Sequence, residues 1–275
     1  MYTGCDLNTT MDDMENLDAI SPYVLAAMGN EFVNPNDTTA FGVVGAVEAV
    51  LDNVQGKTLL VHGCGAVGGT VARELIRSGA KVYTIDANPE KADIFGAINI
   101  SKGADKYIEE WWKLELDALV PCSISGLITE EVIAHLGCKA IVGATNLPFK
   151  TVELQAKVEA SGITFVPEGV SSAGAVIVDS IEHYDKEAFC NASPIDLYEF
   201  CRYSVRSKSV ELIELSKHHN MVTSAGTPIV MEEFADAGTL PIGKQFRFWV
   251  AGRNSVTAPG TCGERRAKQR IGTAA

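Results

Sequence analysis

The stretch TLLVHGCGAVGGTVARELIRSGAKVYTID, residues 58–86, decides the fold of this 275-residue chain. An apolar run of strand length leads into three glycines with the spacing GxGxxG, which are Gly63, Gly65 and Gly68. A segment with helical spacing follows, and a second strand-like run ends at Asp86. A strand, a glycine-rich turn, a helix and a second strand that ends in an acid are the context in which a dinucleotide-binding turn occurs.

Each position of this turn has its own physical role in holding a dinucleotide. Gly63 permits the tight turn, Gly65 lets the backbone approach a pyrophosphate, and Gly68 lets the helix pack closely on the strand. The N–H groups that begin the helix, at Ala66 and Val67, would attract the phosphates. The alternative is a glycine-rich turn of an α/β protein that binds nothing.

Asp86 predicts which dinucleotide binds. Its carboxylate can accept hydrogen bonds from the adenosine ribose hydroxyls and would repel a 2′-phosphate. The next residues, Ala87 and Asn88, supply no cation that would offset this repulsion. The expected cofactor is therefore NAD.

The strand–helix alternation continues beyond this unit. Three more apolar runs of strand length follow, at 117–122, 139–144 and 163–168. Two helical stretches lie between them, near 129–136 and 151–160. Strands that alternate with helices indicate a parallel sheet covered on both faces. We predict an α/β fold whose residues 55–185 form a doubly wound, Rossmann-type domain.

Helices are expected on both sides of this domain. Residues 1–54 would form a hinge segment and a connecting helix over 38–51, capped by Asn36 or Asp37. Small residues in that helix, Gly42, Gly45, Ala46 and Ala49, would allow close packing on a neighbour. Residues 186–275 would form C-terminal helices and a tail, with a long helix over 194–219 and a short one after Pro228.

Composition excludes several classes of protein. Apolar residues make up 46% of the chain, yet no apolar run approaches the roughly 18 residues of a membrane span. The net charge of −12 argues against nucleic acid as a partner. The seven cysteines stand singly and the five histidines form no cluster, so we expect reduced thiols in a cytoplasmic protein and no metal site.

Several motifs, in the same order along the chain, resemble the glutamate, leucine, phenylalanine and valine dehydrogenase family, and most of all its phenylalanine and leucine branch. They are TGCDLNTTMDDM at 3–14, TTAFGV at 38–43, GCGAVGG at 63–69, PCSISGLITEEV at 121–132, IVGATN at 141–146 and VSSAGAVI at 170–177. The resemblance implies oxidative deamination of an L-amino acid to a 2-oxo acid with a nicotinamide cofactor.

The resemblance also implies roles for individual residues. Asp6 would be the carboxylate that moves a proton to and from the substrate nitrogen, and Thr39 would lie near the nicotinamide amide. Pro121 and Cys122 would follow a strand end in the crevice for the cofactor, and Asn146 would face the cofactor amide and the substrate. Without the family, Asp6 is more often a helix cap, and Thr39 is an ordinary first-turn residue.

The chain departs from the family pattern near the nicotinamide half of the site. Leu147 stands where the family has a second Asn, Ser172 where it has an Asn, and Ala175 where it has a Gly. Each change removes or reshapes a polar contact there. The family also holds its substrate with two lysines of an N-terminal domain, and Gly243–Lys244 is the nearest imitation of that motif here.

Three interpretations stay open at this point. The chain is the cofactor half of an amino-acid dehydrogenase, truncated or paired with a separate catalytic chain. Alternatively it is a self-contained NAD-dependent reductase of another substrate such as an imine. The third is an NAD-binding protein without deaminase activity. The expected partners are an amino acid or 2-oxo acid and, for the protein, either a second copy or a separate catalytic chain.

Overall fold

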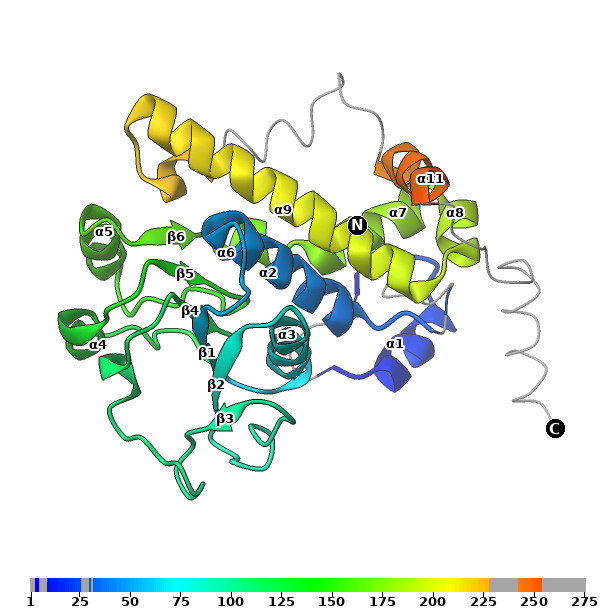
Figure 1. The fold of residues 1–275 in the computed structure, drawn as a ribbon. Coiled ribbons are helices and arrows are strands. Elements are labelled where there is room, and N and C mark those ends of the chain that lie inside the picture. The colour runs from blue at the N-terminus through cyan, green and yellow to red at the C-terminus, as the bar shows by residue number, and fades with distance from the viewer. Residues whose placement is uncertain (1–2, 5–8, 26–29, 31, 228–241, 254–275) are drawn as a thin grey trace.

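A computed structural model describes residues 3–4, 9–25, 30, 32–227 and 242–253 of the chain. Its centre is a six-stranded sheet with the strand order β3-β2-β1-β4-β5-β6 (Figure 1). The strands are β1 (Thr58–His62), β2 (Lys81–Ile85), β3 (Ile98–Asn99), β4 (Ala118–Pro121), β5 (Ala140–Val142) and β6 (Thr164–Val166). All neighbouring strands are parallel. The predicted doubly wound α/β fold is confirmed.

Helices follow the strands in the predicted alternation. Those before and within the sheet are α1 (Met11–Asp18), α2 (Pro35–Leu51), α3 (Ala66–Arg77), a 3-10 turn (Trp111–Lys113), α4 (Glu130–His135) and α5 (Val152–Ala160). Those after it are α6 (Glu168–Ser171), α7 (Gly174–Tyr184), α8 (Lys186–Asn191), α9 (Pro194–His219) and α11 (Ile242–Arg253). Helix α9 has the predicted bounds, and the helix expected after Pro228 lies outside the described residues.

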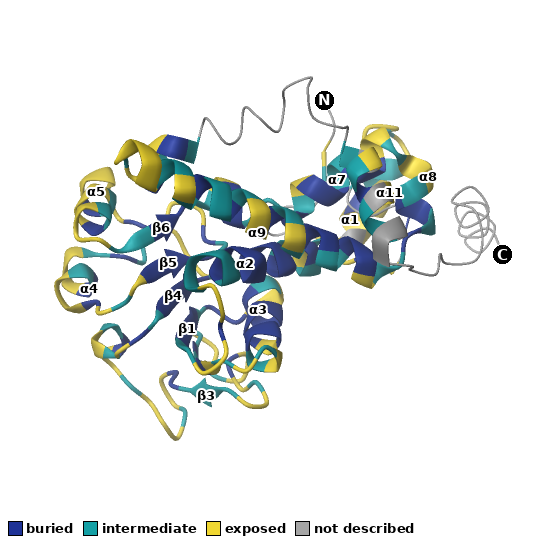
Figure 2. Ribbon diagram, turned by 45° about the horizontal axis from the view of Figure 1, so that its top comes forward, coloured by how far each residue is buried: buried dark blue, intermediate teal, exposed yellow. Residues whose placement is uncertain are grey.

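Successive residues of the strands other than β3 pack in two different cores. Leu59 and Val61 of β1 pack in a large core with α2, α3, α7 and α9. Leu60 packs in a second core, to which Trp111, Val132 of α4 and Val158 of α5 contribute. Figure 2 shows the central strands and α2 as mostly buried, with exposed positions on the outer faces of the covering helices. The sheet is therefore covered on both faces, as a parallel sheet requires.

Helix α2 begins earlier than the sequence pattern predicted. Its N-cap is Asn34, whose side chain accepts a hydrogen bond from the N–H of Asn36 over 2.9 Å, so the expected cap at Asn36 or Asp37 was wrong. Pro35 suits the first helical position because its fixed φ matches the helix and its missing N–H is not needed there. The predicted close packing of α2 is confirmed. A Cβ on Gly45 would lie 2.2 Å from the carbonyl oxygen of Arg202 in α9.

Polar and aromatic contacts join the segments that flank the Rossmann-type core. The buried Asn30 amide donates hydrogen bonds to the carbonyl oxygens of Phe189 and Ala192. Helix α11 packs Phe246 against Phe200 of α9, and Arg247 binds the Asp185 carboxylate with an N–O distance of 2.6 Å. The proposed division of the chain after residues 54 and 185 stays a prediction.

The expectation that the cysteines are reduced was wrong for one of them. Cys190 is disulfide-bonded, whereas Cys64, Cys122, Cys138 and Cys201 are free. A disulfide needs two Cβ atoms within about 4.5 Å in space, and sequence spacing does not reveal this when the partners are far apart along the chain. Within the described ranges, no helix is long and apolar enough to cross a membrane.

Candidate functional site

The glycine turn lies between the carboxyl end of β1 and the start of α3. Gly63 has φ 92°, and a Cβ there would lie 2.6 Å from the carbonyl oxygen of Cys122. A Cβ on Gly68 would lie 1.9 Å from the carbonyl oxygen of Gly63. A Cβ on Gly65 would have no atom within 4 Å. The backbone of this chain therefore packs against Gly63 and Gly68, while Gly65 faces open space.

The start of α3 is suited to an anion. Gly65 is the N-cap residue and makes no side-chain hydrogen bond to the first turn, which contains Ala66 and Val67. The first N–H groups of a helix have no partner within the helix, and the helix dipole places partial positive charge there. A ligand phosphate beside Gly65 would meet these groups without displacing a side-chain cap.

Asp86 is fixed beside the glycine turn at the carboxyl end of β2. One of its carboxylate oxygens accepts from the Cys64 N–H over 2.7 Å, and the other accepts from the Asn88 N–H over 2.9 Å. Its own N–H donates to Ser101 Oγ over 3.0 Å. A carboxylate oxygen accepts more than one hydrogen bond, so both oxygens keep capacity for a ligand hydroxyl.

Pro121 and Cys122 join the ends of three strands. The Cys122 N–H donates to the carbonyl oxygen of His62 over 2.7 Å, and the Pro121 carbonyl oxygen accepts from the N–H groups of Ala144 and Thr145 over 2.9 and 3.0 Å. Burial raises the pKa of the Cys122 thiol to about 12. A thiol that stays protonated is a poor nucleophile, so Cys122 has a structural place in this crevice.

Asn146 lies in the exposed loop after β5, at the same edge of the sheet. Its carbonyl oxygen accepts from the Ser125 hydroxyl over 2.6 Å. The next residue, Leu147, has φ 50° and donates its N–H to a Glu168 carboxylate oxygen over 2.9 Å. Glu168 of α6 thereby holds the loop that carries Asn146.

Two other predicted residues do not belong to these strand ends. Thr39 is half-buried in α2, where the start of α7 approaches it, and a Cβ on Gly174 would lie 2.9 Å from the Thr39 Cα. Asp6 lies outside the described residues. The structure thus groups the glycine turn, Asp86, Pro121, Cys122 and Asn146 at the carboxyl ends of β1, β2, β4 and β5. In doubly wound sheets, ligands bind at this edge, where the strand order reverses.

Sequence reasoning did not assign His62 and Ser123 to this site. His62 Nδ1 and Ser123 Oγ are 2.9 Å apart. Burial lowers the pKa of His62 to about 4, although the nearby Asp86 carboxylate acts in the opposite direction. The available signal was their position, because each stands at or just after the end of a strand that the pattern predicted.

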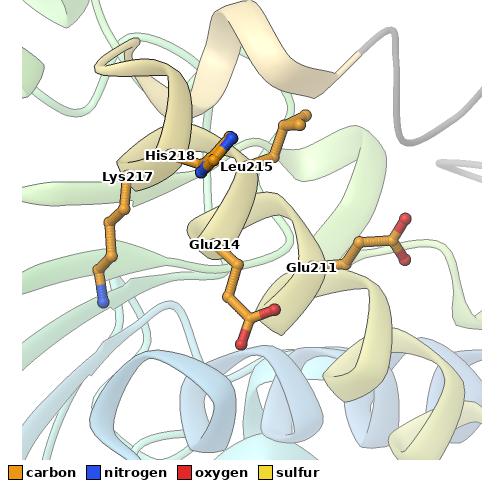
Figure 3. A pocket seen from close by; sticks show the side chains of 5 residues that line it. All are labelled: Glu211, Glu214, Leu215, Lys217 and His218. Carbon is orange, nitrogen blue, oxygen red and sulfur yellow. The ribbon is translucent and has the colours of Figure 1, made fainter.

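A separate open hollow lies along the C-terminal half of α9 (Figure 3). It has a volume of about 650 Å³ and is lined by Glu211, Glu214, Leu215, Lys217 and His218. All of these residues belong to one helix, and none belongs to the carboxyl edge of the sheet. Among the described residues, no group of three His, Cys, Asp or Glu side chains is placed to hold a metal ion.

Comparison with known proteins gives two kinds of likeness. A sequence model of the glutamate/leucine/phenylalanine/valine dehydrogenases matches residues 88–199. The chain is 30% identical to leucine dehydrogenase of Thermoactinomyces intermedius over 196 residues, which are 67% of this chain and 53% of that protein. It is 28% identical to phenylalanine dehydrogenase of Lysinibacillus sphaericus over 200 residues, which are 66% of this chain and 51% of that protein.

Solved structures share the fold. L-tryptophan dehydrogenase from Nostoc punctiforme superposes with a TM-score of 0.66 at 21% identity, over 84% of this chain and 66% of that one. Hetero-hexameric glutamate dehydrogenase from Thermus thermophilus superposes with a TM-score of 0.64 at 16% identity, over 92% of this chain and 64% of that one. The chain spans about half the length of the curated relatives it matches. With its motifs in the predicted order and its Rossmann-type sheet, the chain belongs to the glutamate/leucine/phenylalanine/valine dehydrogenase family, on the side of the leucine and phenylalanine dehydrogenases.

Proposed function

We propose that this chain is the cofactor-binding part of an NAD-dependent amino-acid dehydrogenase, which converts an L-amino acid to a 2-oxo acid and runs in reverse as a reductive aminase. The observation that carries this proposal is the open space at Gly65 beside the uncapped start of α3, with Asp86 fixed next to it by the Cys64 N–H. Membership of the family supports the reaction class.

The residues at the carboxyl edge fit a dinucleotide. Gly65 leaves room for a pyrophosphate, and the N–H groups of Ala66, Val67 and Gly68 lie in the first turn of α3, where an anion is favoured. Asp86 would accept hydrogen bonds from the adenosine ribose hydroxyls. Because its carboxylate would repel a 2′-phosphate, we propose NAD over NADP.

A bound nicotinamide ring would supply the acceptor for the hydride that leaves the α-carbon of the amino acid. The residues of this chain would hold and orient the reacting groups. Pro121 and Cys122 would line the crevice. Thr39 would lie near the nicotinamide amide, and Asn146 would face that amide and the substrate. Asp6 would take up and return the proton of the substrate nitrogen, since that nitrogen loses charge as the hydride leaves.

The substrate would be a small amino acid or 2-oxo acid, and the protein partner a second copy or a separate catalytic chain. A glutamate dehydrogenase with the same fold is hetero-hexameric, which is consistent with assembly from more than one kind of chain. The family's substrate-binding lysines belong to a domain that would precede residue 3 in the family's order.

Calorimetric titration of the purified 275-residue chain with NAD and NADP tests the cofactor part of the proposal. We expect binding of NAD and much weaker binding of NADP. Absence of NAD binding by a folded chain would contradict the proposal. Formation of NADH with a panel of L-amino acids then tests the reaction.

For that panel, we expect the 275 residues alone to give little turnover and to gain it when a polypeptide with the family's lysine domain is added. Positioning of the substrate can account for about 7–11 kcal/mol of a barrier. Robust deamination by the 275 residues alone would instead point to a lysine within them, and Lys244 would be the first to replace. NAD binding without turnover under either condition would favour an NAD-binding protein without deaminase activity.

A further inference from the structure

His62 and Ser123 form a polar pair across two neighbouring strands. His62 ends β1 and stands opposite Pro121 of β4, and Ser123 follows two residues after Pro121. This register brings His62 Nδ1 to 2.9 Å from Ser123 Oγ. The Ser123 N–H donates to Thr145 Oγ1 over 2.8 Å, which fixes the Ser123 backbone from the side of β5.

Ser123 also adjoins the glycine turn. A Cβ built on Gly63 would lie 2.6 Å from the Ser123 Cβ, so the serine side chain stands directly against the first glycine of the turn. Ser123 is exposed, whereas the neighbouring Pro121 is buried. A hydroxyl in this position is accessible to a ligand that lies over the turn.

The ring of His62 lies beside this hydroxyl and contacts an aromatic ring. Its ring meets Trp111 edge-on with a centroid distance of 5.1 Å. Burial lowers its pKa to about 4, so the ring is neutral near pH 7 and carries one N–H. When that hydrogen is on Nδ1, His62 donates to Ser123 Oγ, and the serine hydroxyl hydrogen is free to point away from His62.

We propose that Ser123 is a further cofactor-binding residue, whose hydroxyl donates a hydrogen bond to a pyrophosphate oxygen of the dinucleotide, and that His62 is the residue that positions it. This role for the two residues rests on the proposed function, since it concerns the same crevice. The pyrophosphate is the acceptor because it is the part of the dinucleotide that lies over the Gly63–Gly65 turn. A hydroxyl beside that turn adds a side-chain donor to the backbone N–H groups of α3.

The Ser123→Ala variant tests the donor. We expect binding of NAD and of ADP-ribose, which both contain the pyrophosphate, to weaken by roughly 10-fold or more, as is typical for a hydrogen bond to a charged acceptor. Binding of adenosine, which lacks the pyrophosphate, should stay unchanged. Ser161→Ala is the matched control, because the Ser161 hydroxyl donates to the Val158 carbonyl oxygen at the other edge of the sheet.

Two substitutions at His62 test the positioning role. His62→Asn can place an amide N–H near the site of Nδ1 and should keep most of the NAD affinity. His62→Leu removes the donor and should weaken NAD and ADP-ribose as Ser123→Ala does. The double variant, Ser123→Ala with His62→Leu, should lose no more affinity than either single variant, because the two residues act as one unit.

The outcomes separate this inference from the proposed function. If the unsubstituted chain binds no NAD, the proposed function fails. If it binds NAD and Ser123→Ala binds equally well, the Ser123 inference is overturned while the function stands. Equal losses in His62→Asn and His62→Leu, in variants with an unchanged thermal transition, would contradict the donor role of His62. Equal weakening of adenosine and NAD would show that Ser123 acts on another part of the cofactor.

Discussion

Gly68 lies so close to Gly63 that a Cβ on Gly68 would stand 1.9 Å from the Gly63 carbonyl oxygen and 2.9 Å from the Cys122 Cβ. A nonbonded carbon and oxygen atom cannot approach to the first distance. Gly65, in the same turn, has no atom within 4 Å of its Cβ position and a negative φ of −70°. The glycines of one motif are therefore required for two different reasons, which a pair of substitutions can separate.

Gly65→Val should lose NAD binding and keep its thermal transition, because the new side chain enters the space proposed for the pyrophosphate. Gly68→Val should lower the thermal transition, because the helix and strand would have to move apart. Overpacking of this kind costs typically about 1–3 kcal/mol or more. Calorimetric titration with NAD and thermal denaturation of both variants are the measurements. Undiminished NAD affinity in Gly65→Val would show that the turn is purely structural.

Asp86→Ala should weaken the binding of NAD by roughly 1–3 kcal/mol, the range for buried hydrogen-bond partners left unsatisfied. It should also reduce the difference in affinity between NAD and NADP. The carboxylate also accepts from the Cys64 and Asn88 N–H groups, so the thermal transition must be measured as well. Asp86→Asn is the matched control, because it retains an acceptor oxygen and removes the charge. Equal or tighter binding of NADPH than of NADH by the unsubstituted chain would refute the role assigned to Asp86.

Asp6→Asn should reduce turnover by about 10²–10⁴-fold in the complete catalytic assembly, which is the usual scale for a general acid-base group. The amide cannot exchange a proton with the substrate nitrogen, whereas NAD binding does not depend on that exchange. Steady-state rates should therefore fall, whereas the NAD affinity measured by titration should stay unchanged. A lower thermal transition with an unchanged rate would instead assign Asp6 a structural role, although the N-cap of α1 is Thr10.

His62 should make the folded state less stable as the pH falls. The pKa of His62 is lowered from 6.5 to about 4 in the folded chain, mainly by burial. The unfolded chain therefore takes up a proton at His62 before the folded chain does, and stability that is fully present above pH 6.5 decreases as the pH falls towards 4. Thermal denaturation across this range, in the unsubstituted chain and in His62→Leu, measures the contribution. A pH dependence that is identical in both would show that other groups cause it.

Local sequence predicted most strands, the longer helices around them and the turn that carries the expected site. The alternation of strand-length and helical runs predicted every strand except the two-residue β3, since a run as short as Ile98–Asn99 has no periodicity of its own. The GxGxxG spacing placed the turn between β1 and α3, and Asp86 follows β2 as predicted. These features are encoded by neighbouring residues, whose backbone and side-chain preferences act over a few positions.

Only the tertiary structure decided which strand ends lie together and which atoms meet there. Ser123 stands against Gly63 because β4 pairs with β1, a neighbour that the chain reaches only after a crossover through β2 and β3. The disulfide at Cys190 likewise depends on a meeting in space. Distances between residues far apart in the chain are set by strand order, register and core packing, and no local pattern of residues contains them.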